Sequence, residues 1–188
     1  MRDTIKRLIE KSYSNGVAQA YLSFSPSKHD IERLRQVAVE VLTHIRLDPG
    51  ACAMMSAVWA TKLIHTGKYP VHVVAGDLII KGQSIFSCGN DQSGTAFKTD
   101  NLDWTGHCWI VFGDHIGDIS ICRTAYSDRV PGLKEFIVEN IGEKAGALIC
   151  TQYEFAEIGM QYTPRYVLDQ AAIDGMYNWC LYWTQASR

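Results

Sequence analysis

The sequence lacks the features that mark several large classes of protein. No run of apolar residues approaches the roughly 18 that a membrane-spanning helix needs. No block of like charge is present, because 18 Lys and Arg are interspersed with 20 Asp and Glu to a formal net charge of -2, whereas a nucleic-acid-binding surface needs clustered basic residues. The first residues lack the apolar segment of a secretory signal. We therefore expect a soluble, cytoplasmic protein with no nucleic-acid or membrane partner.

The sequence is also poor in the spacings that bind metals or build disulfide frameworks. Its six cysteines, at positions 52, 88, 108, 122, 150 and 180, are spread over a long and apolar chain, so we expect reduced thiols. Cys108 beside His107 suggests a zinc site with Cys88 as one alternative. No Cys-x-x-Cys or His-x-x-x-His pattern supports that alternative, and in a strand Cys108 points to the face opposite His107. We predict no metal and no cofactor.

The sequence does contain enough apolar residues for one large core. With 188 residues, of which 47% are hydrophobic, and no internal repeat or linker, it predicts a single domain over residues 1–188. We expect helices over residues 2–13, 30–46, 48–67, 131–141 and 168–185, and strands over 71–80, 84–87, 107–112, 115–121, 147–151 and 158–163. Because helices come first and mainly antiparallel strands follow, the predicted fold class is α+β.

Two of the expected helices begin with recognisable N-terminal signals. Asp30 suits the N-cap of the amphipathic helix over 30–46. In the next helix, Asp48 suits the N-cap and Pro49 the first helical position, while Gly67 suits the C-terminal stop. Local chemistry therefore predicts both ends of this second helix.

A polar stretch over residues 88–106 separates two groups of expected strands. It is too long and too hydrophilic to be a simple connection. We interpret it as a loop that shapes a binding site.

Cys52 falls in the first turn of the helix over 48–67. Unpaired amides and the helix dipole lower the pKa of a thiol at such a position, and the same amides can receive an oxyanion. Cys52, Ser56 and Ala60 form a stripe of small residues that would let a sheet lie close against the helix. A lone cysteine in an apolar helix is more often a core residue, so the prediction of Cys52 as nucleophile depends on a partner base.

His107 is the predicted base because it opens a strand and because histidine is the usual proton acceptor for a thiol. A two-residue turn at Gly113-Asp114 would pair residue 112 with 115 and so place Asp118 diagonally from His107 on the same face. The Asp118 carboxylate could then hold the imidazole in one tautomer. A turn longer by one residue would move Asp118 to the opposite face, where it would be an ordinary turn residue.

Several short segments together carry a family resemblance: Gly50-Ala51-Cys52, Val71-His72-Val73-Val74-Ala75-Gly76, Gly106-His107-Cys108-Trp109 and Gly117-Asp118. In this order, over about residues 48–122, they resemble the transglutaminase-like branch of the papain-like cysteine protease superfamily. The resemblance implies a papain-like fold with the nucleophile at a helix N-terminus packed on a mainly antiparallel sheet. It also implies a catalytic triad of Cys52, His107 and Asp118.

The expected function is that of a cysteine hydrolase or acyltransferase acting on an amide, ester or thioester carbonyl through an acyl-enzyme. The substrate would be a peptide or a small amide or acyl compound. The alternative is a catalytically inactive binding or regulatory domain of the same fold, because a fold does not by itself fix a function.

The C-terminal part of the chain is rich in aromatic residues, and three roles are open for them. They could line a substrate groove, form a homodimer contact or belong to the core, which is the commonest role of aromatic residues at helical spacing. The residues concerned are Tyr162, Tyr166, Tyr177, Trp179, Tyr182 and Trp183. We assign them no function from the sequence.

Overall fold

The structure is a computed structural model that describes residues 1–45, 51–67, 69–89, 104–127, 129–143 and 145–186. The helices are α1 (Arg2–Ser12), α2 (Asn15–Ser23), α3 (Lys28–His44), α4 (Cys52–Gly67), α5 (Ile121–Ala125), α6 (Leu133–Asn140), α7 (Gln152–Glu157) and α8 (Gln170–Ala186). The strands are β1 (Val71–Ile80), β2 (Gln83–Phe86), β3 (His107–Phe112), β4 (His115–Asp118), β5 (Leu148–Thr151) and β6 (Met160–Val167). Helices thus precede an antiparallel, curled sheet, and the predicted α+β class is confirmed.

The sheet is organised around β1, its longest strand. β3 pairs with β1 from Val71 to Gly76, and β2 pairs with it from Leu78 to Ile80. β6 pairs with residues 74–80 of the same strand. Because a strand has only two edges, β6 occupies one edge and β3 and β2 share the other. The end of β2 therefore lies beside the beginning of β3.

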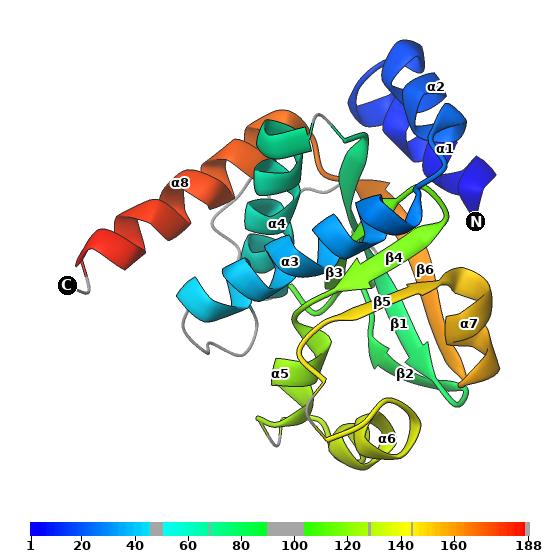
Figure 1. Ribbon diagram of the computed structural model, residues 1–188. Helices are drawn as coiled ribbons and strands as arrows, with labels where there is room; N and C mark the ends of the chain where they lie inside the picture. Colours follow the sequence, from blue (N-terminus) through cyan, green and yellow to red (C-terminus); the bar gives the residue numbers. More distant parts are fainter. Residues whose placement is uncertain (46–50, 68, 90–103, 128, 144, 187–188) are drawn as a thin grey trace.

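Hydrophobic clusters cover both faces of the sheet, and alternate residues of β3 contribute to each. Cys108 and Ile110 belong to the cluster that contains α3, α4 and part of α8. Trp109 and Val111 belong to the cluster on the other face, with α1, α6 and α7. In Figure 1, α4 lies between the sheet and the neighbouring helices α3 and α8, which both contact it.

α4 packs closely against β4, where the ring of Trp59 in the helix contacts Gly117 in the strand. A Cβ atom added at Gly117 would lie 2.6 Å from the ring of Trp59, so only glycine leaves room for this indole. Trp59 is fully buried, and its Nε1–H donates to the carbonyl oxygen of Leu34 in α3 at 3.2 Å. This single side chain therefore fixes α4 against both the sheet and α3.

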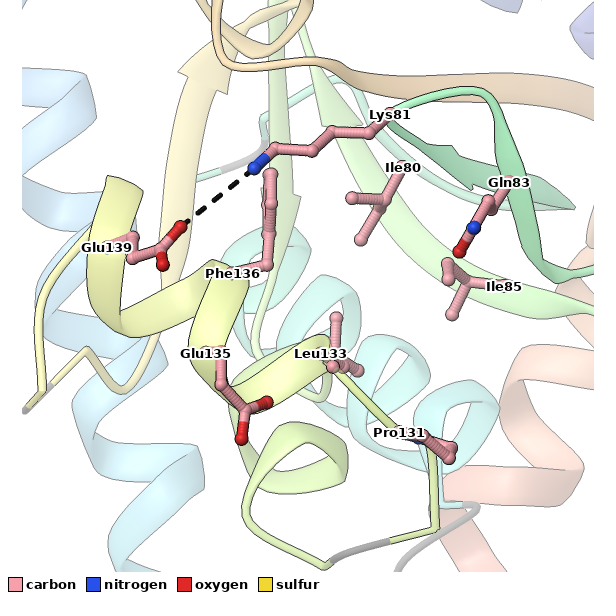
Figure 2. Close-up of a pocket in the computed structure, with 10 residues that line it drawn as sticks. Ile80, Lys81, Gln83, Ile85, Pro131, Leu133, Glu135, Phe136 and Glu139 are labelled. Carbon is pink, nitrogen blue, oxygen red and sulfur yellow. Dashed lines mark ion pairs between the residues drawn. The ribbon is translucent and has the colours of Figure 1, made fainter.

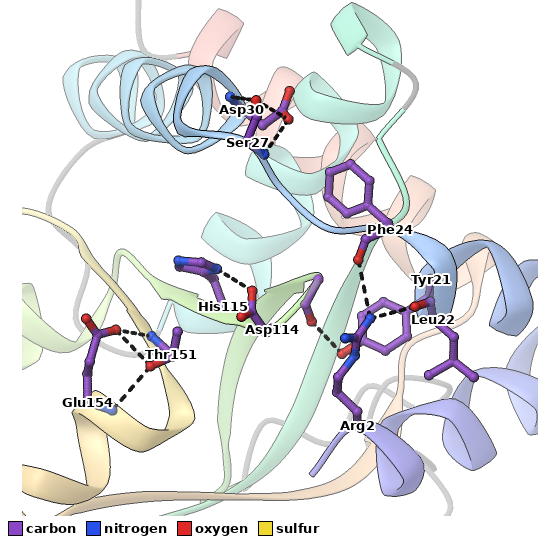
Figure 3. Close-up of polar contacts among 11 residues, drawn as sticks. Arg2, Tyr21, Leu22, Phe24, Ser27, Asp30, Asp114, His115, Thr151 and Glu154 are labelled. Carbon is purple, nitrogen blue, oxygen red and sulfur yellow. Dashed lines mark hydrogen bonds and ion pairs between the residues drawn. The ribbon is translucent and has the colours of Figure 1, made fainter.

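The start of α3 differs from the prediction. Ser27, not Asp30, is the N-cap, and its hydroxyl accepts a hydrogen bond from the Asp30 amide at 3.2 Å. The Asp30 carboxylate in turn accepts from the Ser27 amide at 2.8 Å, which completes a capping box. Figure 3 shows the same reciprocal pattern at Thr151 and Glu154, where α7 begins.

Three short helices, α2, α5 and α7, lie where no helix was predicted. The strand expected over 115–121 ends at Asp118, because the carboxylate of Asp118 accepts hydrogen bonds from the amides of Ser120 and Ile121 and turns the chain into α5. Asp48 and Pro49, the predicted N-terminal signals of α4, lie outside the described residues. Among the described helices, none has the length and apolarity required to cross a membrane.

Candidate active site

The three residues of the predicted triad come from three different elements. Cys52 is the first residue of α4, His107 is the first residue of β3, and Asp118 is the last residue of β4. All three are buried, with Cys52 at 9% exposure and the other two at 1% or less.

The β3–β4 hairpin brings His107 and Asp118 together. Phe112 pairs with His115, and Ile110 pairs with Gly117, which is the register expected from a two-residue turn. The diagonal placement follows from this register, and the imidazole Nε2 lies 2.5 Å from an Asp118 carboxylate oxygen.

Asp118 is held by hydrogen bonds to both of its oxygens. Oδ1 accepts from the Ser120 amide at 3.0 Å and hydroxyl at 3.1 Å, and from the Ile121 amide at 3.0 Å. Oδ2 accepts from the Tyr162 hydroxyl at 3.0 Å and faces His107. Burial by itself raises the pKa of Asp118, but the charge of His107 and these hydrogen bonds outweigh burial and lower it. The carboxylate is therefore ionised and fixed in orientation.

Tyr162 is a member of this site that the sequence analysis left without a role. It lies on β6, 44 residues from Asp118 in the chain, and its side chain is 1% exposed. Burial, followed by the charge of Asp118, raises the pKa of its hydroxyl well above the ordinary value, so it remains a hydrogen-bond donor. No local pattern in the sequence indicates this contact, because it depends on β6 pairing with β1.

The ring of His107 is enclosed by aromatic side chains. Phe86, at the end of β2, stacks on it with ring centroids 4.8 Å apart and an interplanar angle of 13°. This contact follows from β2 and β3 sharing one edge of β1. Trp109 lies 6.2 Å from the same ring and Tyr162 lies 6.4 Å from it. The imidazole consequently has little freedom to rotate away from Asp118.

His107 and Cys52 form a strongly coupled pair. Burial alone lowers the pKa of His107, but the charge and hydrogen bond of Asp118, together with those of Cys52, raise it to about 10. Because Nε2 faces Asp118, Nδ1 is the nitrogen left for the sulfur of Cys52. This arrangement favours an imidazolium next to a thiolate at neutral pH.

The Cys52 thiol has an additional partner in Cys108, whose side chain lies on the α4 side of β3. The hydrogen bond from Cys108 is the largest influence and lowers the pKa of Cys52, burial opposes it, and the hydrogen bond and charge of His107 lower it further. The pKa of Cys52 is thus held well below its ordinary value. The sequence correctly predicts that Cys108 points away from the face of His107, but it does not reveal that α4 and Cys52 occupy that other face.

The ends of the polar stretch over 88–106 lie next to this site, while residues 90–103 are outside the described residues. The Ser87 amide donates to the Thr105 carbonyl at 3.1 Å, and the Thr105 hydroxyl donates back to the Ser87 carbonyl at 2.8 Å. The Cys88 amide donates to Asp77 at 2.8 Å, and Asp77 also pairs with Arg165. Both ends of the stretch are therefore anchored at the junction of β2 and β3.

A separate cavity of about 210 Å³ lies between the β1–β2 turn and α6. Figure 2 shows Lys81 extending across it toward Glu139, with its ammonium group 5.4 Å from the centre of the Phe136 ring. The residues that line this cavity include none of the predicted triad.

The arrangement around Cys52 supplies a nucleophile, a proton carrier and a fixed carboxylate. Among the described residues, no group of three or more His, Cys, Asp or Glu side chains is placed to hold a metal ion. No family model, no curated protein and no solved structure matches the chain.

Proposed function

We propose that this protein is a cysteine hydrolase or acyltransferase with a papain-like, transglutaminase-like fold, in which Cys52, His107 and Asp118 form the triad. The observation that carries the proposal is the buried hydrogen bond between His107 and Asp118, together with the charge of His107, which helps to lower the pKa of Cys52. A thiolate at the first residue of α4 next to a histidine that is itself oriented by a carboxylate is the general pattern of an activated nucleophile.

The reaction follows from the protonation states of the pair. The Cys52 thiolate attacks an amide, ester or thioester carbonyl carbon, and the carbonyl oxygen takes up negative charge near the amides of the first turn of α4. The His107 imidazolium then gives its proton to the leaving amine, alcohol or thiol, which leaves a thioester on Cys52. His107, now neutral, accepts a proton from water or an amine as it attacks the thioester, and the thiolate is released.

Asp118 orients His107 and stabilises its charged form throughout this cycle. It remains ionised, because its two oxygens already accept hydrogen bonds from Tyr162, Ser120 and Ile121. No cofactor takes part in the proposed steps.

The second candidate is a binding or regulatory domain that retains the triad residues without turnover. Its supporting observation is that only 9% of Cys52 is exposed in the described structure. A substrate carbonyl must reach the sulfur atom for chemistry, whereas a binding domain has no such requirement.

The deciding experiment measures the pH dependence of iodoacetamide labelling at each cysteine by peptide mapping, in wild type and in His107→Ala. We expect selective labelling of Cys52 with an apparent pKa below about 7 in the wild type, and a value near the ordinary thiol pKa of about 8.5 in the variant. His115→Ala is the matched control, because His115 also contacts an aspartate, Asp114, at 2.7 Å but lies at the opposite end of the hairpin strand.

A chromogenic acyl ester then tests turnover in the same three proteins, with Cys52→Ser as the blank. An acyl adduct on Cys52 detected by mass spectrometry supports the enzyme. Slow labelling of Cys52 with an apparent pKa near 8.5, or labelling that His107→Ala leaves unchanged, would refute the enzyme proposal. The binding or regulatory domain would then be the better account of the chain.

A further inference from the structure

Phe86, the last residue of β2, covers one face of the His107 ring. The two rings are nearly parallel, at 13°, with their centroids 4.8 Å apart. Leu78 pairs with Phe86 and Gly76 pairs with His107 along the same edge of β1. Paired residues and alternate residues of a strand point to the same face, so both side chains leave the sheet on one side. The pairing of β1 with two strands on one edge therefore produces the stack.

The two residues after Phe86 are held by hydrogen bonds from other parts of the chain. The Ser87 amide donates to the Thr105 carbonyl at 3.1 Å, and the Thr105 hydroxyl donates to the Ser87 carbonyl at 2.8 Å. The Cys88 amide donates to Oδ1 of Asp77 at 2.8 Å. These three bonds fix the backbone that positions the ring of Phe86.

Asp77 is a buried charged residue that takes no part in the proposed reaction. It lies in β1 and is 7% exposed. Its Oδ2 accepts a hydrogen bond from Nε of Arg165 in β6 at 2.7 Å. A buried charge is tolerated when it is paired and hydrogen-bonded, and Asp77 meets both conditions. Its carboxylate therefore ties the chain after β2 to β1 and β6.

The stack places an aromatic face beside a ring that carries positive charge when protonated. A cation within about 6 Å of the centroid of such a face is attracted by its quadrupole. The titratable groups that act on His107 are Asp118 and Cys52, and the ring of Tyr162 lies 6.4 Å away. Phe86 has no titratable group, so it favours the imidazolium without competing for its protons.

We propose that Phe86 is a positioning residue of the active site, which holds the His107 imidazolium by a cation–π contact, and that Asp77 keeps Phe86 in place by binding the chain that follows it. Phe86 exchanges no proton and undergoes no covalent change. It keeps the plane of the imidazole directed at Asp118 and stabilises the charged form of the ring. This inference rests on the proposed function, because it concerns the base of the same triad.

The first test compares Phe86→Leu, which keeps an apolar side chain but removes the aromatic face, with Phe86→Tyr, which keeps the face. NMR follows the titration of the His107 ring protons, which are assigned by their loss in His107→Ala. We expect the midpoint to fall by about one unit in Phe86→Leu and to change by less than about 0.3 unit in Phe86→Tyr. With an anilide substrate, whose amine leaving group needs the proton of His107, the alkaline limb of kcat should move by the same amount.

Phe24→Leu is the matched control, because Phe24 is also half-buried but makes an edge contact with Phe112, with ring centroids 5.0 Å apart. We expect it to leave the His107 titration unchanged. In Phe86→Leu itself, labelling of Cys52 at pH 7 should change less than about twofold. The reason is that the pKa of His107 is raised to about 10, so a fall of about one unit leaves the ring charged at that pH.

The second test compares Asp77→Ala with Asp77→Asn. Both variants lose the charge that faces Arg165, but only asparagine retains an oxygen that can accept from the Cys88 amide. We therefore expect the midpoint of His107 to fall further in Asp77→Ala than in Asp77→Asn. The ring-current shift that Phe86 imposes on the His107 protons should also be smaller in Asp77→Ala.

The outcomes separate this inference from the proposed function. An unchanged His107 midpoint in folded Phe86→Leu, or a fall that Phe86→Tyr does not restore, overturns the role of Phe86 and leaves the enzyme proposal intact. Equal midpoints in Asp77→Ala and Asp77→Asn overturn the role of Asp77. A wild-type Cys52 that titrates as an ordinary thiol overturns the enzyme, while a midpoint shift that tyrosine restores still supports the contact between Phe86 and the imidazolium.

Discussion

Two buried histidines of the same sheet have opposite electrostatic environments. His107 opens β3, where it pairs with Gly76, and His72 lies near the start of β1, where it pairs with Val111. His107 and His72 are 1% and 5% exposed, yet the pKa of the first is raised to about 10 while burial lowers that of the second to about 4.

The difference lies in what faces each ring. The neighbours of His72 include the edges of two tyrosine rings, Tyr13 at 5.3 Å and Tyr21 at 6.0 Å, and among the described residues its Nε2 has no hydrogen-bond partner. His107 faces the carboxylate of Asp118. Burial therefore keeps one histidine neutral down to about pH 4, and a single carboxylate turns the other into a cation beside a thiol.

Removing that carboxylate should have the largest effect. In Asp118→Asn we expect His107 to become neutral, as His72 is, and Cys52 to become an ordinary thiol near pH 7. A thiol with the ordinary pKa of about 8.5 is only about 3% ionised at pH 7, so labelling of Cys52 at neutral pH should slow by up to about 30-fold. Breaking a buried pair by removing one partner also costs about 3–5 kcal/mol of unfolding free energy, which urea unfolding measures.

Asp114→Asn is the control for this change, since Asp114 pairs with His115 on an exposed turn. We expect little change in either measurement for that variant. If Cys52 is labelled as fast in Asp118→Asn as in the wild type, the Asp118 carboxylate is not what distinguishes His107 from His72.

The second prediction concerns the pH dependence of stability. Because the folded pKa of His72 is about 4 and the ordinary value is 6.5, the unfolded chain binds a proton below pH 6.5 that the folded chain does not bind until about pH 4. As the pH drops from 6.5 to about 4, the contribution of His72 should lower the free energy of unfolding by about 3 kcal/mol. His72→Phe places an apolar ring against the same two tyrosines and removes the titrating group. The loss of unfolding free energy between pH 6.5 and 4, measured by urea unfolding at several pH values, should therefore be smaller by about 3 kcal/mol in this variant.

The contribution of His107 to the free energy of unfolding should change with pH in the opposite direction. Its raised pKa contributes stability that is fully present below pH 6.5 and lost as the pH rises through about 10. Asp118→Asn should therefore flatten the alkaline side of the stability profile and His72→Phe the acidic side. A variant that flattens the other side would refute the assignment of the two environments.

The smallest effect is expected for Tyr162→Phe, which removes one hydrogen bond to Asp118 and leaves the carboxylate charge in place. A hydrogen bond to a charged group contributes about 2 kcal/mol, so the unfolding free energy should fall by about that amount. Labelling of Cys52 should change less than about threefold, because an opposite charge shifts a pKa more than one neutral donor does. Tyr126→Phe, which removes a hydrogen bond from a 43%-exposed tyrosine to Glu143, should cost less.

The elements that the sequence predicted best are those with strong local signals. β1 and β3 have the expected bounds, because runs of β-branched and aromatic residues mark them, and the Gly113-Asp114 turn gives the expected hairpin register. α3 begins two residues before its predicted start, because Ser27 rather than Asp30 caps it, and it ends at His44. α7 was not predicted, although Thr151 and Glu154 form a capping-box pattern in the sequence, because a helix of six residues shows little hydrophobic periodicity.

The parts of the candidate site that escaped prediction depend on contacts between distant segments. The proximity of His107 and Asp118 follows from one hairpin, so a local argument predicts it. Tyr162 and Phe86 reach the same two residues only because β6 and β2 both pair with β1. The strand period shows that Cys108 and His107 point to opposite faces, but only the packing of α4 shows which face carries Cys52.

The pairing of β1 with β6 also determines the order in which the chain can be completed during synthesis. β1 can pair with β3 once residue 112 has been synthesised, but its other edge cannot be paired until residues 160–167 have left the ribosome. The end of α1 depends on the same late part of the chain, because the hydroxyls of Ser12 and Tyr13 donate to the carbonyl oxygens of Val167 and Leu168 at 2.6 and 2.8 Å. Docking of β6 therefore covers the second edge of β1, supplies acceptors for α1 and places the Tyr162 hydroxyl beside Asp118, so a nascent chain carries the Cys52 thiol before it can carry the complete environment of that thiol.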